Sequence, residues 1–91
     1  MDSALFLKHI RDAQHSLDNA VGILRDAKSE DVVEYHPVIK LVSERANLLR
    51  NSIIRKQLLE GWKHKDIADM WGLHVSRISQ LKKLLLGDRN E

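Results

Sequence analysis

The 91-residue sequence has no cysteine, only one proline and only four aromatic residues, two of them tryptophans. Without cysteine the chain can form neither a disulfide nor a thiolate zinc finger, and it is compatible with a reducing compartment. The shortage of proline and aromatic residues, beside abundant leucine, isoleucine, alanine and charged residues, favours helices over strands. We therefore expect an all-α fold.

Long apolar runs are also missing. No run approaches the roughly 20 residues that span a bilayer. The start of the chain lacks the basic-then-apolar order of a secretory signal, because Asp2 follows the first residue and the apolar run Leu5–Leu7 is short. We expect a cytoplasmic, nucleoid-associated protein without membrane contact. Its 43% hydrophobic and 31% charged residues indicate a globular chain.

Catalytic and metal-binding patterns are sparse. His9 and His15 are six residues apart and fall on different helix faces, and His64 and His74 belong to different predicted elements. No carboxylate–histidine pair has the spacing of a zinc-binding helix, and there is no glycine-rich phosphate loop or nucleophile elbow. We expect no enzymatic activity, no cofactor and no metal.

The most informative segment, residues 61–83, predicts two short helices joined by a sharp turn. The first ends at Gly72, since glycine takes a left-handed conformation without a Cβ clash, and Leu73 fills the turn. The second, residues 75–86, is amphipathic. Ala68 lies where two steeply crossing helices come closest and only a small side chain fits. The apolar positions at helical spacing are Ile67, Ala68, Trp71, Val75, Ile78, Leu81 and Leu85.

The small residue, turn glycine, plug and two spaced hydrophobic residues resemble the DNA-binding helix-turn-helix family. Residues 55–61 resemble the supporting helix in response-regulator output domains and sigma-factor promoter-reading domains. The resemblance implies a tri-helical DNA-binding domain over residues 51–91. Lys63 and His74 depart from the family's usual polar N-caps, so we expect both motif helices to begin imprecisely, although Asp66 keeps half of a capping box. The matching positions are Ala68, Gly72, Leu73, Ile78 and Leu81.

The resemblance also implies which residues meet DNA, because the N-terminal half of the second helix faces base edges in the major groove. Gln80 suits adenine, and Arg77 suits guanine or a phosphate. Ser79 could contact either a base or a phosphate. For every candidate the alternative is that the residue merely lies on a solvated helix surface. The base-contact candidates are Val75, Ser76, Arg77 and Gln80. The phosphate-contact candidates are Lys63, Lys65, His74, Ser79, Lys82 and Lys83.

Charge is distributed unevenly along the chain, whose net charge is +2. Residues 1–44 carry five basic and eight acidic residues, a net −3, whereas residues 45–91 carry ten and five, a net +5. The half that contains the motif therefore has the positive potential expected of a surface that meets phosphates.

Residues 1–50 predict a helical hairpin that mediates dimerisation. The first helix begins after Asp2 or Ser3 and runs to about Lys28. The apolar residues of this helix form a heptad seam in which alanine recurs every seventh residue, which suits close antiparallel pairing. The seam, and predicted dimer interface, consists of Phe6, Ile10, Ala13, Leu17, Ala20, Leu24 and Ala27.

A short non-helical connection is expected over residues 32–37, because Val32 and Val33 disfavour a helix and Pro37 restricts the residue before it. A second helix should begin near Pro37. Whether residues 51–52 cap a new helix or lie within a long one is left open. The predicted core places Ile53, Ile54, Leu58, Leu59 and Trp62 against Ile67, Trp71, Ile78 and Leu81.

Taken together, these patterns predict a homodimeric all-α regulator of transcription, of the kind found as repressors in bacteria, phages or plasmids. Double-stranded DNA is the expected partner, with RNA polymerase or another regulator as a further candidate. The alternative is a helical protein-interaction module, an adaptor or inhibitor of another regulator, whose motif is only structural. The N-terminal helices could pair within a chain, between chains or with another protein.

Overall fold

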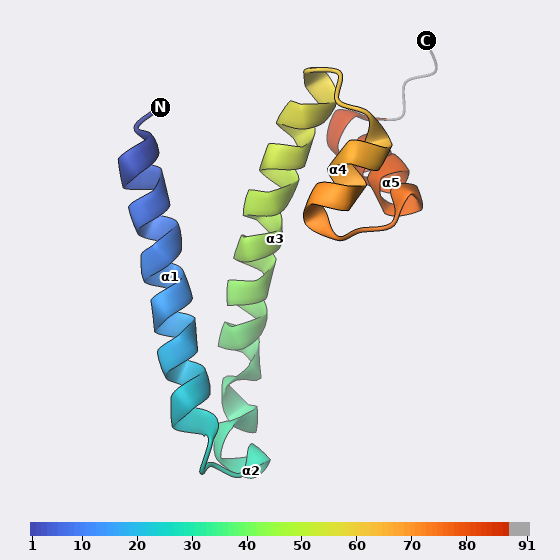
Figure 1. Cartoon of the computed structure of the whole chain (residues 1–91). Helices are drawn as coiled ribbons and strands as arrows, with labels where there is room; N and C mark the ends of the chain where they lie inside the picture. Colours follow the sequence, from blue (N-terminus) through green and yellow to red (C-terminus); the bar gives the residue numbers. More distant parts are fainter. Residues whose placement is uncertain (88–91) are drawn as a thin grey trace. The chain divides into compact units, whose positions relative to one another are not determined.

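A computed structural model describes residues 1–87, and these contain helices and turns but no strand (Figure 1). The all-α fold is thus confirmed. None of the helices in this range is long and apolar enough to cross a membrane. The chain divides into two compact units, Met1–Pro37 and Val38–Glu91. In order, the elements are α1 (Ser3–Leu24), α2 (Ser29–Val32), the 3-10 helix η1 (Val33–Tyr35), α3 (His36–Leu59), α4 (His64–Trp71) and α5 (Val75–Leu86).

Helix α1 begins as expected but ends early. The Asp2 carboxylate accepts a hydrogen bond from the Leu5 backbone N–H at 3.0 Å, which caps the first turn. The helix ends at Leu24 rather than near Lys28, because the next bonds are of the tighter three-residue type, such as Ala27 N–H to the Leu24 carbonyl. Ala27 therefore lies beyond α1, and the helical seam stops at Leu24.

The expectation of a non-helical connection over residues 32–37 was wrong, because α2 and η1 occupy residues 29–35. The Asp31 carboxylate accepts a hydrogen bond from the Lys28 backbone N–H at 3.0 Å, and Glu30 and Asp31 both lie in the first turn of α2. Acidic groups at a helix start interact favourably with its dipole, which offsets the weak helix propensity of the two valines. Helix α3 then begins at His36 and holds Pro37 in its first turn, as expected.

Helix α3 continues without interruption through residues 51–52. The Ser52 hydroxyl donates to the Leu48 carbonyl at 2.8 Å, one turn back, so this serine lies within the helix and does not cap a new one. The compact units accordingly divide between Pro37 and Val38, whereas the sequence suggested a boundary at 50/51.

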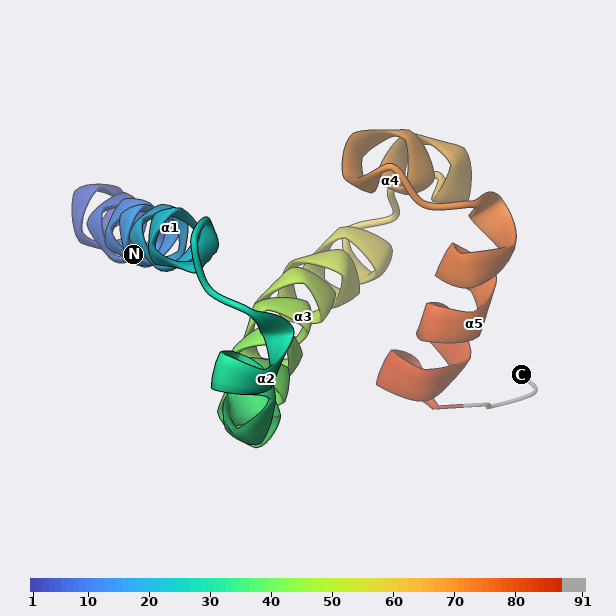
Figure 2. The same cartoon turned by 90° about the horizontal axis from the view of Figure 1, so that it is seen from below.

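The second unit has a small core between the C-terminal part of α3, α4 and α5 (Figure 2). Leu59 and Trp62 were wrongly expected in this core, since both are exposed. Leu59 ends α3, and Gly61, at φ 86°, turns the chain so that the Trp62 N–H bonds to the Gln57 carbonyl at 3.0 Å. The buried residues are Ile54, Ile67, Ala68, Ile78 and Leu81, with Leu58, Trp71, Leu73 and Leu85 packed against them.

Candidate nucleic-acid interface

The turn between α4 and α5 has the geometry that the sequence predicted. Gly72 is left-handed, at φ 65° and ψ 34°. The N–H groups of Gly72 and Leu73 both donate to the Ala68 carbonyl, the latter at 2.9 Å, which closes the end of α4. Ala68 is only 1% exposed, and Leu73 is half-buried against the core. The small residue, the turn glycine and the plug therefore occupy their predicted places.

Helix α5 begins more sharply than expected, because His74 acts as its N-cap. The His74 Nδ1 accepts the Ser76 backbone N–H at 3.1 Å and lies 2.8 Å from the Ser76 hydroxyl oxygen. A ring nitrogen that accepts the backbone N–H carries no hydrogen, so the hydroxyl must donate to it. Lys63, by contrast, makes no side-chain cap for α4, although Asp66 lies in the first turn of that helix.

The base-contact candidates are exposed residues in the first half of α5, and we call this set of residues the α5 face. It contains Val75, Ser76, Arg77 and Gln80, all exposed. Arg77 and Gln80 are also bonded to each other: the Arg77 Nη1 donates to the Gln80 Oε1 at 3.3 Å. Helix α5 contains no aspartate or glutamate, so no carboxylate of this helix competes for Arg77 or repels phosphate.

The phosphate-contact candidates are exposed, with one exception. Ser79 is half-buried, and its hydroxyl oxygen lies 3.5 Å from the His64 Nδ1, across the boundary between α5 and α4. This position suits a contact between the two motif helices better than a contact with DNA. The exposed candidates are Lys63 and Lys65 at the start of α4, His74 before α5, and Lys82 and Lys83 on α5.

A polar network between α3 and α4 was not predicted from the sequence. Gln57 is only 6% exposed, and its Oε1 accepts a hydrogen bond from the Trp71 Nε1 at 3.0 Å. Its Nε2 lies 3.2 Å from the Met70 sulfur, so one amide connects α3 to two residues of α4. The only available signal was spacing, because Gln57 follows the buried Ile54 by three residues and shares its face.

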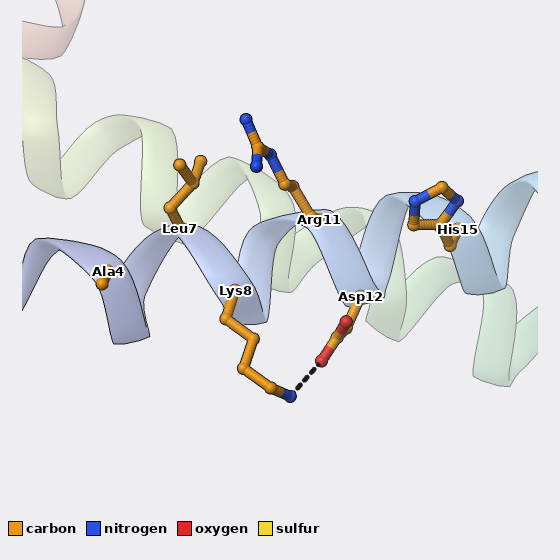
Figure 3. Close-up of a pocket in the computed structure, with 6 residues that line it drawn as sticks. All are labelled: Ala4, Leu7, Lys8, Arg11, Asp12 and His15. Atoms are coloured by element: carbon orange, nitrogen blue, oxygen red, sulfur yellow. Dashed lines mark hydrogen bonds and ion pairs between the residues drawn. The ribbon is translucent and has the colours of Figure 1, made fainter.

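Helix α1 carries an open hollow that does not form a site. Its lining includes the exposed ion pair between Lys8 and Asp12, at 2.8 Å, a kind of contact that contributes little stability. Within residues 1–87 no three histidine or acidic side chains are placed to hold a metal ion. Since all the lining residues belong to α1, nothing encloses a ligand there (Figure 3): they are Ala4, Leu7, Lys8, Arg11, Asp12 and His15.

The predicted dimer seam lies on α1 and is exposed throughout. Leu17, near its centre, is 50% exposed, and α1 contains no buried residue. The seam within the helix consists of Phe6, Ile10, Ala13, Leu17, Ala20 and Leu24.

No family model matches this chain, and neither does any curated protein or any solved structure.

Proposed function

We propose that this chain is a sequence-specific, double-stranded-DNA-binding regulator of transcription that inserts α5 into the major groove. The observation that carries the proposal is the turn at Gly72, which joins a buried Ala68 on α4 to the exposed polar α5 face. The major groove of B-DNA admits an α-helix, and arginine and glutamine are side chains that read base edges there.

The distribution of charge also supports α5 as the DNA-binding surface. The half of the chain after residue 44 has a net charge of +5, and α5 carries Arg77, Lys82 and Lys83 without any acidic residue. Lys63 and Lys65 are exposed at the start of α4. Basic groups on both sides of a recognition surface supply phosphate contacts that fix its position on the duplex.

The proposal includes a homodimer that forms through the α1 seam. In the heptad of Ile10, Leu17 and Leu24, the positions on both sides of the seam contain no lysine, arginine or acidic residue. The charged residues of α1 thus lie away from a broad, mostly apolar face, as in a helix that packs against others. These flanking positions are Leu7, Gln14 and Val21 on one side and His9, Ser16 and Ile23 on the other.

A two-fold dimer places two α5 faces on one duplex and thereby selects a two-part site. In this proposal the dimer occupies an operator near a promoter and blocks or assists RNA polymerase, as repressors of bacteria, phages and plasmids do. It would then be found on the nucleoid in the cytoplasm.

The test is a fluorescence-anisotropy titration of the full chain against random and selected duplexes at two salt concentrations. Specific binding should be tight and should weaken steeply with salt. Arg77→Ala with Gln80→Ala should reduce binding to the selected duplex to the level of random DNA. The matched control is Arg11→Ala with Asn19→Ala, which removes an exposed arginine and an exposed side-chain amide from α1, away from the seam and its flanking positions.

Equally weak binding to every duplex would contradict the proposal. It would favour the alternative of a helical protein-interaction module, in which the basic half merely touches phosphates. If the α5 double variant and the α1 double variant lose equal affinity for the selected duplex, the assignment of the α5 face is also contradicted. Such a result would show only an effect of charge.

A further inference from the structure

Gln80 is bonded in a way that bears on which base the α5 face reads. A glutamine that recognises adenine needs both ends of its amide: Oε1 accepts from the adenine N6 amino group and Nε2 donates to N7. In this structure the Gln80 Oε1 already accepts a hydrogen bond from Arg77 Nη1, at 3.3 Å. The amide oxygen is directed along α5 toward Arg77 and has one of its two lone pairs occupied, whereas the amino group keeps both of its donors for DNA.

Arg77 keeps most of its donors. A guanidinium has five N–H groups, and the bond to Gln80 uses one of them. Among residues 1–87 the edge formed by Nε and Nη2 makes no hydrogen bond, and helix α5 supplies no carboxylate to occupy it. The Arg77–Gln80 pair therefore presents chiefly donors, because the Gln80 oxygen keeps only its second lone pair. Among the base edges of the major groove, guanine is the one that offers two acceptors, N7 and O6, and no donor.

We infer that Gln80 is a positioning residue that holds Arg77 for guanine, and that it does not itself read adenine. The inference rests on the proposed function and specifies the base class that the site selects. Because the bond joins residues three apart on one helix, it orders the arginine before DNA arrives, and less side-chain freedom is lost on binding.

The experiment compares the wild type with Gln80→Glu and Gln80→Leu on duplexes that the wild type selects from a random library. Exchange of the key guanine for adenine should weaken wild-type binding about 5- to 150-fold, the range for a bidentate contact. Gln80→Glu keeps an acceptor for Arg77 and should retain that preference, with all duplexes bound more weakly. Gln80→Leu removes the acceptor for Arg77 and should therefore lose most of the preference for guanine over adenine.

The control for added negative charge is Asn19→Asp on α1, which is exposed, lies away from the seam and its flanking positions, and is distant in sequence from the α5 face. Gln80 is itself exposed, so its variants should fold, and circular dichroism verifies this. A selected site in which Gln80→Glu changes a preferred adenine to cytosine would overturn the inference alone, since it would show direct reading by Gln80. Failure of the wild type to select any duplex would overturn the proposed function and the inference together.

Discussion

The Trp71 indole N–H donates to the side-chain oxygen of Gln57 at 3.0 Å, and this bond joins the first motif helix to the helix that supports it. Gln57 is the only polar residue in the core among residues 1–87. Every buried side-chain nitrogen and oxygen in that range has a partner. A polar group in so small a core favours one arrangement of α3 and α4, because other arrangements leave it unsatisfied.

Gln57→Leu should lower the free energy of unfolding by about 1–3 kcal/mol, because the Trp71 N–H loses its acceptor in a half-buried place. Trp71→Phe removes the donor and leaves the Gln57 oxygen unpaired. The double variant should be less destabilised than the sum of the single variants, which urea denaturation followed by circular dichroism measures. Asn19→Leu, at an exposed site on α1 away from the seam and its flanking positions, is the control. Strictly additive effects would show that the bond contributes nothing.

Ala68→Leu should destabilise the second unit by about 1–3 kcal/mol, because the larger side chain overfills a closely packed position. Ala68 is 1% exposed and belongs to the core shared by α3, α4 and α5. Thermal unfolding gives the measurement, and Ala4→Leu, at an exposed alanine of α1, supplies the same substitution outside any core. Equal melting temperatures for the two variants would contradict the close approach of the motif helices.

Alanine substitution at two glycines should change stability in opposite directions. Gly72→Ala forces a left-handed conformation on a residue with a Cβ and should cost about 1–2 kcal/mol. No heavy atom would contact the added Cβ, so the cost comes from the backbone alone. Gly22→Ala, within α1 and equally free of contacts, should stabilise by about 0.5–1 kcal/mol. The denaturant concentration at the midpoint of unfolding measures both changes. A Gly72→Ala variant with unchanged stability would contradict the left-handed turn.

The C-terminal half was well predicted from sequence because its patterns are local. Ala68, Gly72 and Leu73 each perform a task that few residue types can perform, so their order determines the turn. The range of α5, Val75–Leu86, agrees with the predicted helix for the same reason. The exposed places of Arg77 and Gln80 then follow from the helical period.

Side-chain bonds were harder to predict. The N-cap role of His74 depends on which ring nitrogen is turned toward the backbone, and the partner of Gln57 lies 14 residues further along the chain. Trp62 has the spacing of a core residue, but α3 ends at Leu59 and the left-handed Gly61 changes the direction of the chain before Trp62. The tryptophan is therefore exposed. The helix over residues 29–32 was not predicted, because the acidic residues in its first turn outweigh the low helix propensity of Val32 at its end.

The histidine cap of α5 predicts a substitution pattern. His74→Ala should destabilise the second unit by about 0.5–2 kcal/mol, because the Ser76 N–H loses its acceptor. His74→Asn should retain most of the stability, since asparagine is a favourable N-cap. Urea denaturation compares the two variants, and His15→Ala, at an exposed histidine of α1 away from the seam, is the control. If His74→Asn is destabilised as much as His74→Ala, capping does not explain the effect.

The α1 seam predicts how the oligomeric state responds to a single charge. Leu17→Asp places a carboxylate at the centre of the proposed interface, where burial without a partner is strongly unfavourable, and should convert the dimer to a monomer in sedimentation equilibrium. His15→Asp puts the same charge on another face of the helix and should leave the dimer intact. The monomeric variant should still bind DNA through one α5 face, but with lower affinity and no preference for the spacing of two half-sites. A wild type that sediments as a monomer, or a Leu17→Asp variant that remains dimeric, would show that the seam serves another contact.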